Sequence, residues 1–348
     1  MAVFSGGGIG VDLGSSNVTI CIAGEGVVLR EPDCVLVEAA DDEEILAFGR
    51  EAKTMMGRTP ADVMLLSPVV DGAVTDENLV TQMITELAEK ALGKRRPFER
   101  ARLCVTMSPG ATKVERNALV HALRALNVKY ACIVKTPVAA AVGAGVDISE
   151  ARGMLSVSIG GSVTEIAVMS MNGVVAFRSM RSGSTAMDEA IVRYIRKEKG
   201  LVIGLRTAED LKCDLADCML DPNSHIDMEE VLLRGRDAVT GRPNTVKVTA
   251  RDITRAVQQP IEAIVEAVRD ALSNTPPELA GDIAETGIHL SGGGALLTGL
   301  AAQLEKVTRL KVHMSETPQD DVALGACAIA SSNDLIDAFV RSGALIEC

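Results

Sequence analysis

Two glycine-containing segments have the residue types of phosphate-binding turns. Residues 157–165 read Val-Ser-Ile-Gly-Gly-Ser-Val-Thr-Glu, an apolar run that breaks at two glycines and small hydroxyl residues and then resumes as a strand. Residues 11–19, Val-Asp-Leu-Gly-Ser-Ser-Asn-Val-Thr, repeat this pattern early in the chain. Glycines let the backbone N–H groups of such a hairpin approach phosphate oxygens closely. The sequence therefore predicts two phosphate-contacting hairpins, one in each half of the chain.

The two segments differ at one chemically important position. Asp12 of the first segment is matched by Ser158 of the second, so the second hairpin lacks the acid. A further glycine cluster follows where the apolar residues 288–290 run directly into Ser291 and the three glycines at 292–294. Glycines after a strand admit a ligand close to the backbone. A nucleotide between the halves would then have its phosphates held by both hairpins.

The hydrophobic pattern places these turns in a duplicated α/β architecture. Each half begins with a hairpin and ends with a helix rich in alanine and glycine, at 136–145 and 321–331. Apolar residues at helical spacing predict further helices at 78–92, 113–126, 187–199, 207–216 and 253–272, the last perturbed at Pro260. Strands are predicted within 9–30 and at 35–37, 103–107, 131–134, 288–290 and 311–313. Segments 45–75 and 221–243 are expected to form small peripheral subdomains.

The composition indicates a globular protein that does not bind nucleic acid. The chain has 348 residues, enough for two domains, and 47% of them are hydrophobic. The formal net charge is -12, which disfavours general binding to DNA or RNA because that binding depends on basic charge. No apolar stretch is as long as a membrane span, and no secretory signal precedes the first strand.

The cysteines and histidines suggest neither disulfides nor a metal site. The eight cysteines contain no Cys-x-x-Cys pair and lie mostly in apolar runs, a pattern typical of reduced thiols in the cytoplasm. The four histidines are scattered along the sequence. We expect them to be surface or helix-face residues.

One stretch, residues 94–102, is strongly basic. It can be a charged surface loop. It can also be a membrane contact, in which Lys94, Arg95 and Arg96 meet anionic lipid while Phe98 enters the interface.

The order and spacing of several motifs resemble the MreB family of bacterial actins, within the actin, sugar-kinase and chaperone ATPase superfamily. The resemblance covers essentially the whole chain and is carried by residues 12–17, 57–60, 110–116, 137–141, 187–192, 234–237, 276–280 and 292–297. It implies the actin-like, ribonuclease H-like fold, with two domains that flank a nucleotide cleft. Domain I would comprise 1–145 and 315–348, with a peripheral subdomain at about 33–70. Domain II would comprise 146–314, with a peripheral subdomain at about 182–247.

The resemblance also implies a function. Members of this family form ATP-dependent filaments in the cytoplasm, on the inner face of the cell membrane, and organise peptidoglycan synthesis and rod shape. The implied ligands are ATP or ADP and Mg²⁺. The implied partners are further copies of the chain, or a paralogue that copolymerises with it, together with membrane proteins of cell-wall elongation.

By position, the resemblance assigns a set of nucleotide-binding residues. Asp12 would also hold Mg²⁺ through water. The full set is Asp12, Gly14, Ser15, Ser16, Asn17, Gly160, Gly161, Ser162, Val163, Glu209, Asp210, Leu211, Lys212, Asp214, Gly292, Gly293, Gly294, Ala295 and Leu296.

The chain departs from the family pattern at three places that bear on ATP hydrolysis. Ser158 stands where the family has an aspartate that helps to hold magnesium. Lys135 and Thr136 replace two glutamates, the second of which orients the attacking water; Lys135 could instead neutralise phosphate charge. Ser162 and Val163 replace a smaller Gly-Thr pair and could crowd the γ-phosphate. Hydrolysis needs an oriented water and a placed cation, so we expect impaired turnover and weakened magnesium binding.

Three hypotheses follow. The first is a filament protein that binds nucleotide but hydrolyses it poorly. The second is an active ATPase in which Glu115 or Glu165 replaces the missing acid. The third is a small-molecule kinase or chaperone ATPase of the same superfamily.

Overall fold

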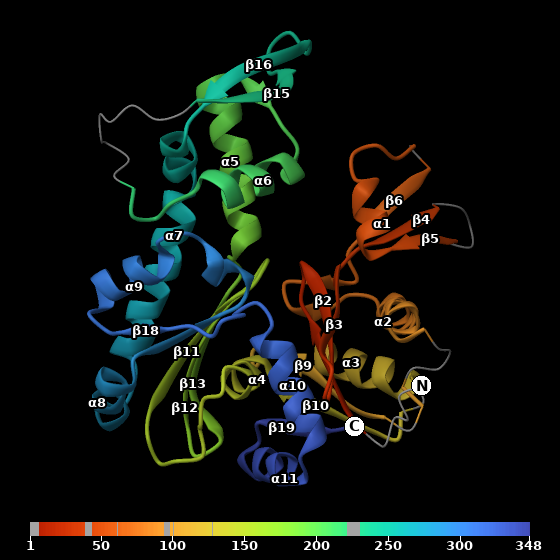
Figure 1. Ribbon diagram of the computed structural model, residues 1–348, viewed down its shortest axis with the longest axis vertical. Coiled ribbons are helices and arrows are strands. Elements are labelled where there is room, and N and C mark those ends of the chain that lie inside the picture. The colour runs from red at the N-terminus through yellow and green to blue at the C-terminus, as the bar shows by residue number, and fades with distance from the viewer. Residues whose placement is uncertain are drawn as a thin grey trace.

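The computed structural model describes residues 7–38, 44–60, 62–93, 98–99, 101–126, 128–220 and 230–348. Its first large sheet has the strand order β19-β10-β9-β1-β2-β3 (Figure 1). These strands are β1 (Gly8–Leu13), β2 (Asn17–Ile22), β3 (Gly26–Pro32), β9 (Arg102–Met107), β10 (Tyr130–Lys135) and β19 (Leu345–Glu347).

The second large sheet repeats this arrangement. It has the order β13-β12-β11-β17-β18, built from β11 (Met154–Ile159), β12 (Thr164–Ser170), β13 (Gly173–Met180), β17 (Ile288–Ser291) and β18 (Val312–His313). In the first sheet β1 pairs antiparallel with β2 and parallel with β9; in the second, β11 pairs antiparallel with β12 and parallel with β17. The shared topology confirms the duplicated α/β fold predicted from the two hairpins.

Two helices of small residues pack against each other between the sheets. They are α4 (Thr136–Gly143) and α10 (Asp321–Ser331) (Figure 1). A β-carbon on Gly143 would overlap the carbonyl of Asp321, and one on Gly325 would overlap the carbonyl of Ala139. The two backbones therefore touch where neither helix has a side chain, as the alanine- and glycine-rich sequences predicted.

The outer faces of the sheets are covered by amphipathic helices. The first sheet packs against α2 (Glu77–Leu92) and α3 (Lys113–Ala125). The second packs against α7 (Ala250–Ser273) and α9 (Leu300–Thr308), and α8 (Pro277–Thr286) lies beside β11. α7 continues through Pro260 as one helix.

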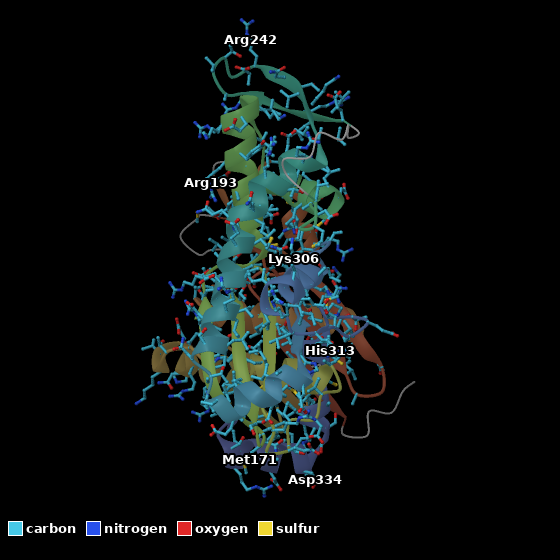
Figure 2. All side chains as sticks on the ribbon, turned by 90° about the vertical axis from the view of Figure 1, so that its left-hand side faces the viewer. Met171, Arg193, Arg242, Lys306, His313 and Asp334 are labelled. Carbon is cyan, nitrogen blue, oxygen red and sulfur yellow. The ribbon has the colours of Figure 1, made fainter. Side chains whose placement is uncertain are left out.

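Each half carries a small peripheral sheet. In the first half, β4 (Val35–Glu38), β5 (Ile45–Phe48) and β6 (Val63–Leu66) accompany α1 (Gly49–Thr54), and β7 (Val69–Val70) pairs with β8 (Ala73–Val74). In the second, α5 (Ser184–Lys199) and α6 (Leu205–Leu215) accompany β14 (Leu201–Val202), β15 (Val231–Asp237) and β16 (Pro243–Val248). Arg242 marks this end of the long axis, and Met171 and Asp334 mark the other (Figure 2). The domain boundaries at 145/146 and 314/315 stay a prediction.

Several elements lay outside the predicted set, among them β14, α8, α11 (Asn333–Ser342) and β19. The glycine cluster leads not into an α-helix but into the short 3₁₀ turn η1 (Gly293–Leu296), and α9 begins after it. Within the part of the chain that the structure describes, no single helix is both long and apolar enough to cross a membrane; α10 and α11 meet that criterion only as a pair bent by 105°.

Candidate functional site

The two glycine hairpins face each other across one pocket. Both turns are closed in the same way, because Gly14 donates to the Asn17 carbonyl at 3.1 Å and Gly160 donates to the Val163 carbonyl at 2.9 Å. A β-carbon on Gly161 would overlap the Ser16 side chain, so the hairpin tips are in contact. Because the Ser16 side chain lies directly against it, position 161 has no room for a side chain of its own. The two hairpins predicted from the repeated sequence pattern thus lie on opposite sides of the same pocket.

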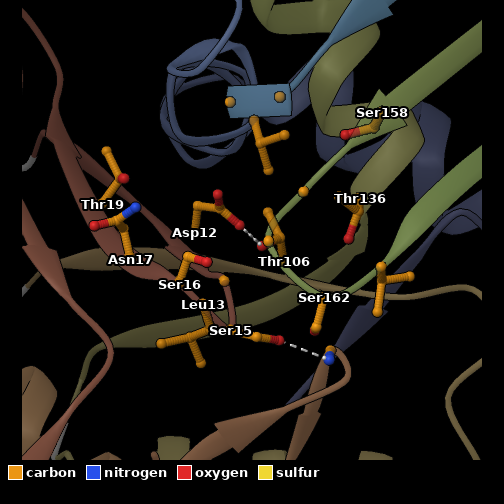
Figure 3. Close-up of a pocket in the computed structure, with 18 of the residues that line it drawn as sticks. Asp12, Leu13, Ser15, Ser16, Asn17, Thr19, Thr106, Thr136, Ser158 and Ser162 are labelled. Atoms are coloured by element: carbon orange, nitrogen blue, oxygen red, sulfur yellow. Dashed lines mark hydrogen bonds between the residues drawn. The ribbon is translucent and has the colours of Figure 1, made fainter. Parts of the chain in front are cut away.

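Most of the predicted nucleotide residues line this pocket. The Ser15 hydroxyl also accepts a hydrogen bond from the Gly72 amide at 3.0 Å, which ties the first hairpin to the loop before β8 (Figure 3). The predicted residues that line the pocket are Asp12, Gly14, Ser15, Ser16, Asn17, Thr136, Ser158, Gly160, Gly161, Ser162, Val163, Glu165, Glu209, Gly292 and Gly293.

Two buried carboxyl groups lie in the pocket. Burial raises the pKa of Asp12 to about 6, and the Thr106 hydroxyl, which donates to Asp12 Oδ1 at 2.9 Å, lowers it in part (Figure 3). Burial also raises the pKa of Glu165 to about 7. Hydrogen bonds from the Ser108 and Thr136 hydroxyls oppose this rise, and the nearby Asp12 carboxylate adds to it. Glu165 Oε1 has no hydrogen-bond partner among the described residues. Near neutral pH, Glu165 can therefore both hold and release a proton.

The remaining groups at the predicted catalytic positions are hydroxyls. Thr136 lies at the start of α4 and Ser158 on β11, and both side chains are seen around the same pocket (Figure 3). A Ser or Thr hydroxyl stays neutral at physiological pH and is a poor proton acceptor. Among the described residues, the carboxyl groups that line the pocket are therefore Asp12, Glu165 and Glu209, and Glu209 is paired with Lys53 at 3.0 Å.

Glu115 is not placed for catalysis. Its carboxylate accepts a hydrogen bond from the Thr112 amide at 2.6 Å, and its amide donates to the Thr112 hydroxyl at 3.2 Å. This is the capping box of α3, and Glu115 lines a different cavity beside β8. The prediction of Glu115 as a substitute acid was wrong, because its side chain closes the end of its own helix.

Several residues assigned by position lie away from the pocket. Lys212 is buried and pairs with Asp188 at 2.8 Å while donating to the Ser184 carbonyl at 3.1 Å. Lys135 is not among the lining residues either, so its expected role against phosphate is not supported. The others that do not line the pocket are Asp210 and Asp214, which are exposed, Leu211 and Ala295, which are in the core, Gly294, which packs on Ile159, and Leu296, which is half exposed.

Sequence reasoning missed a third wall of the pocket. Thr106, Met107 and Ser108 follow one another at the end of β9, the parallel neighbour of β1. Because ligands bind at the carboxyl ends of parallel strands, the apolar run at 103–107 ending in Ser108 was a usable signal. Arg30, Ser184 and Gln319 also line the pocket and are far apart in sequence.

The membrane prediction is corrected in part. Lys94, Arg95 and Arg96 lie outside the described residues. Phe98 is 2% exposed and packs in the core of the first half. Its ring is therefore not available to enter a membrane interface, and that part of the prediction was wrong.

Comparison with known proteins agrees with this geometry. The family model described as MreB/Mbl protein matches residues 6–338. The chain belongs to the MreB/Mbl family. It is 36% identical over 326 residues to the cell shape-determining protein Mbl of Bacillus subtilis, covering 94% of this chain and 96% of that one. It is 38% identical over 322 residues to the cell shape-determining protein MreB of Escherichia coli, covering 91% of each.

Solved structures of this family have the same fold. MreB5 of Spiroplasma citri bound to AMPPNP matches with a TM-score of 0.87 and 28% identity, over 98% of this chain and 100% of that one. The ADP-bound structure of the same protein matches with the same score, over 97% and 99%. The actin-like fold and the membership in a cytoskeletal family are thereby confirmed, and the alternative of a small-molecule kinase or chaperone ATPase is set aside.

Proposed function

We propose that the chain binds ATP or ADP between its two hairpins, assembles into filaments, and hydrolyses ATP slowly. The Spiroplasma structures that share its fold hold AMPPNP and ADP. The pocket of this chain offers what a triphosphate needs, namely two glycine turns whose tips are in contact and small hydroxyl side chains at these tips. Glu209 on α6 lines the same pocket, which supports the proposal that it lies beside the ribose.

The residues present also fit Mg²⁺, though with fewer acids than the family pattern. Glu165 Oε1 is buried and unpartnered among the described atoms, and the Asp12 carboxylate lies in the same pocket. Ser158, at the family's acidic position, supplies only a hydroxyl. When bound, Mg²⁺ neutralises phosphate charge and orders water. We expect the ion to bind with the nucleotide but more weakly than in relatives with an aspartate at 158.

The observation that supports slow hydrolysis is the pair of hydroxyls at Thr136 and Ser158. Neither can accept a proton from water at neutral pH. The test is phosphate release by the purified protein with ATP and Mg²⁺, alongside an equilibrium measurement of ATP binding. Tight binding with little release is the expected result, and turnover equal to that of active bacterial actins contradicts the proposal.

A second candidate, an active ATPase, is favoured by Glu165. Its pKa of about 7, its free Oε1 and its position in the pocket suit a group that orients or deprotonates water. If this candidate holds, Glu165→Gln abolishes turnover and leaves ATP binding in place. If slow release persists unchanged in Glu165→Gln, Glu165 is not the base.

We further propose that the filaments act in the cytoplasm at the inner face of the membrane and support rod shape and peptidoglycan synthesis. Support comes from the curated relatives, which are cell shape-determining proteins. The partners would be other copies of the chain, a copolymerising paralogue, and membrane proteins of wall elongation. The membrane contact would rest on Lys94, Arg95 and Arg96 without Phe98.

Liposome co-sedimentation tests the membrane contact. Replacing the three basic residues with glutamine should abolish binding to anionic vesicles. Lys197, which is exposed on α5, supplies the matched control through Lys197→Gln. Undiminished sedimentation of the triple variant contradicts this proposal.

A further inference from the structure

A second cavity, of about 440 Å³, lies between α4 and the strands β11, β17 and β18. This volume is within the range of small-molecule sites. One wall is formed by Ala140, Ala141, Ala144 and Gly145, and the opposite wall includes His289 and Ser291. None of these residues lines the nucleotide pocket. His313, labelled in Figure 2, lines the cavity from β18.

Ser291 is the polar group that marks this cavity as a site. Along β17, Ile288 and Leu290 belong to the core of the second half, and the alternate residues His289 and Ser291 lie on the other face; both line the cavity, to which Leu290 also contributes. Ser291 is 3% exposed, and its hydroxyl has no hydrogen-bond partner among the described residues. A buried hydroxyl without a partner is destabilising, and a ligand in the cavity would supply one.

The other polar groups of the cavity are imidazoles and hydroxyls. The rings of His289 and His313 are stacked, with centroids 5.4 Å apart. Burial, together with the nearby His313, lowers the pKa of His289 to about 4, so this imidazole is neutral at physiological pH. The Ser315 hydroxyl donates to Asp321 Oδ1 at 2.6 Å and keeps its lone pairs. None of the described lining residues is Lys or Arg.

The chemistry of a ligand follows from these walls. An anion would be desolvated without a counter-charge, which is unfavourable. The wall formed by Ala140, Ala141, Ala144 and Gly145 has no long side chains, which leaves room for a planar apolar group against it. We propose that this cavity binds an uncharged small molecule with a planar apolar body and one hydroxyl group, which lies against α4 and forms a hydrogen bond with Ser291.

The cavity adjoins the nucleotide pocket through two serines. Ser291 pairs in parallel register with Ser158, and Gly292 follows directly; Ser158 and Gly292 both line the nucleotide pocket. The two sites thus lie beside each other along neighbouring strands of the second sheet, and we expect a ligand in one to leave the other free. Only this last statement rests on the proposed nucleotide function.

The probe is 2-naphthol, compared with naphthalene, which lacks the hydroxyl, and 2-naphthoate, which is charged. Binding to the full chain is measured by fluorescence titration without nucleotide. We expect saturable 2-naphthol binding at one site, with little binding of 2-naphthoate. Ser291→Ala should weaken 2-naphthol binding about fivefold, as for one lost hydrogen bond, and leave naphthalene binding unchanged.

Two further variants test whether 2-naphthol binds in this cavity. Ala144→Leu fills the cavity and should remove 2-naphthol binding, while Ala302→Leu on the exposed face of α9 should not. Circular dichroism shows whether each variant is folded, and Ser291→Ala serves alone if Ala144→Leu is not. Absence of saturable binding, binding unaffected by Ser291→Ala, or displacement of 2-naphthol by AMPPNP overturns the proposal. Failure of AMPPNP to bind counts against the proposed function and leaves the titrations without nucleotide valid.

Discussion

Ser158 on β11 lies directly opposite Glu165 on β12, on the same face of the second sheet. In the first sheet, Asp12 on β1 lies opposite Thr19 on β2. The two hairpins therefore contain the same pair of functional groups, a carboxyl and a hydroxyl, with the strands exchanged. Because opposed side chains in an antiparallel pair are close neighbours, the pocket has a carboxyl group, that of Glu165, directly across the ladder from Ser158.

Restoring the two acids of the family pattern should increase hydrolysis. We expect the double variant Thr136→Glu, Ser158→Asp to release phosphate about 10–100 times faster than the wild type, because a placed carboxylate can orient and deprotonate water. Lys135→Glu restores a family acid at a position that does not line the pocket, so it should leave the rate unchanged. Equal rates in the double variant and the wild type would show that the hydroxyls do not limit turnover.

Glu165 should make the protein more stable at acidic than at alkaline pH. Its pKa rises from 4.5 to about 7 on folding, so the folded state binds more protons between these values, and stability falls as pH rises through that window. Glu165→Gln mimics the protonated form. We expect it to raise the free energy of unfolding by on the order of 2 kcal/mol at pH 8 and by little at pH 5. Denaturant unfolding at both values measures this, and a pH-independent difference contradicts it.

Gly161 should be intolerant of any side chain. Its β-carbon would overlap Ser16, so Gly161→Ala should separate the hairpin tips and weaken ATP binding about tenfold or more. Ser16→Gly in the same chain removes the clash and should restore part of the affinity. Gly281→Ala, on α8 where a β-carbon meets nothing within 4 Å, is the matched control. Isothermal titration with AMPPNP measures the affinity of the wild type and of the three variants.

Lys212 should contribute more to stability than to nucleotide contact. Its ammonium group lies 2.8 Å from Asp188 inside the second half, and both side chains are about nine-tenths buried. Lys212→Ala leaves Asp188 unpaired and should lower the free energy of unfolding by about 3–5 kcal/mol. The double variant Lys212→Met, Asp188→Leu should lower the free energy of unfolding much less. Thermal unfolding of the two variants and the wild type measures this difference. If Lys212→Ala is as stable as the wild type but loses most of its ATP affinity, Lys212 is a nucleotide ligand after all.

The sequence alone determined the local elements and the duplication. Helices α2, α3 and α10 follow from apolar residues at helical spacing or from small-residue runs, and both hairpins follow from glycines between apolar strands. These features depend on residues within one or two turns of each other, so their pattern is visible in the linear chain. The same turns carry the motifs that place the chain in its family.

Only the tertiary structure decided which polar side chains share a space. Glu165 and Glu115 both follow a glycine-containing turn, yet one points into the pocket and the other caps its own helix. Phe98 and Lys212 lie in segments that read as surface or ligand contacts, yet both are buried. Burial and partnership come from packing between residues far apart in the chain, here the two halves folding around α4 and α10, and no local spacing encodes them.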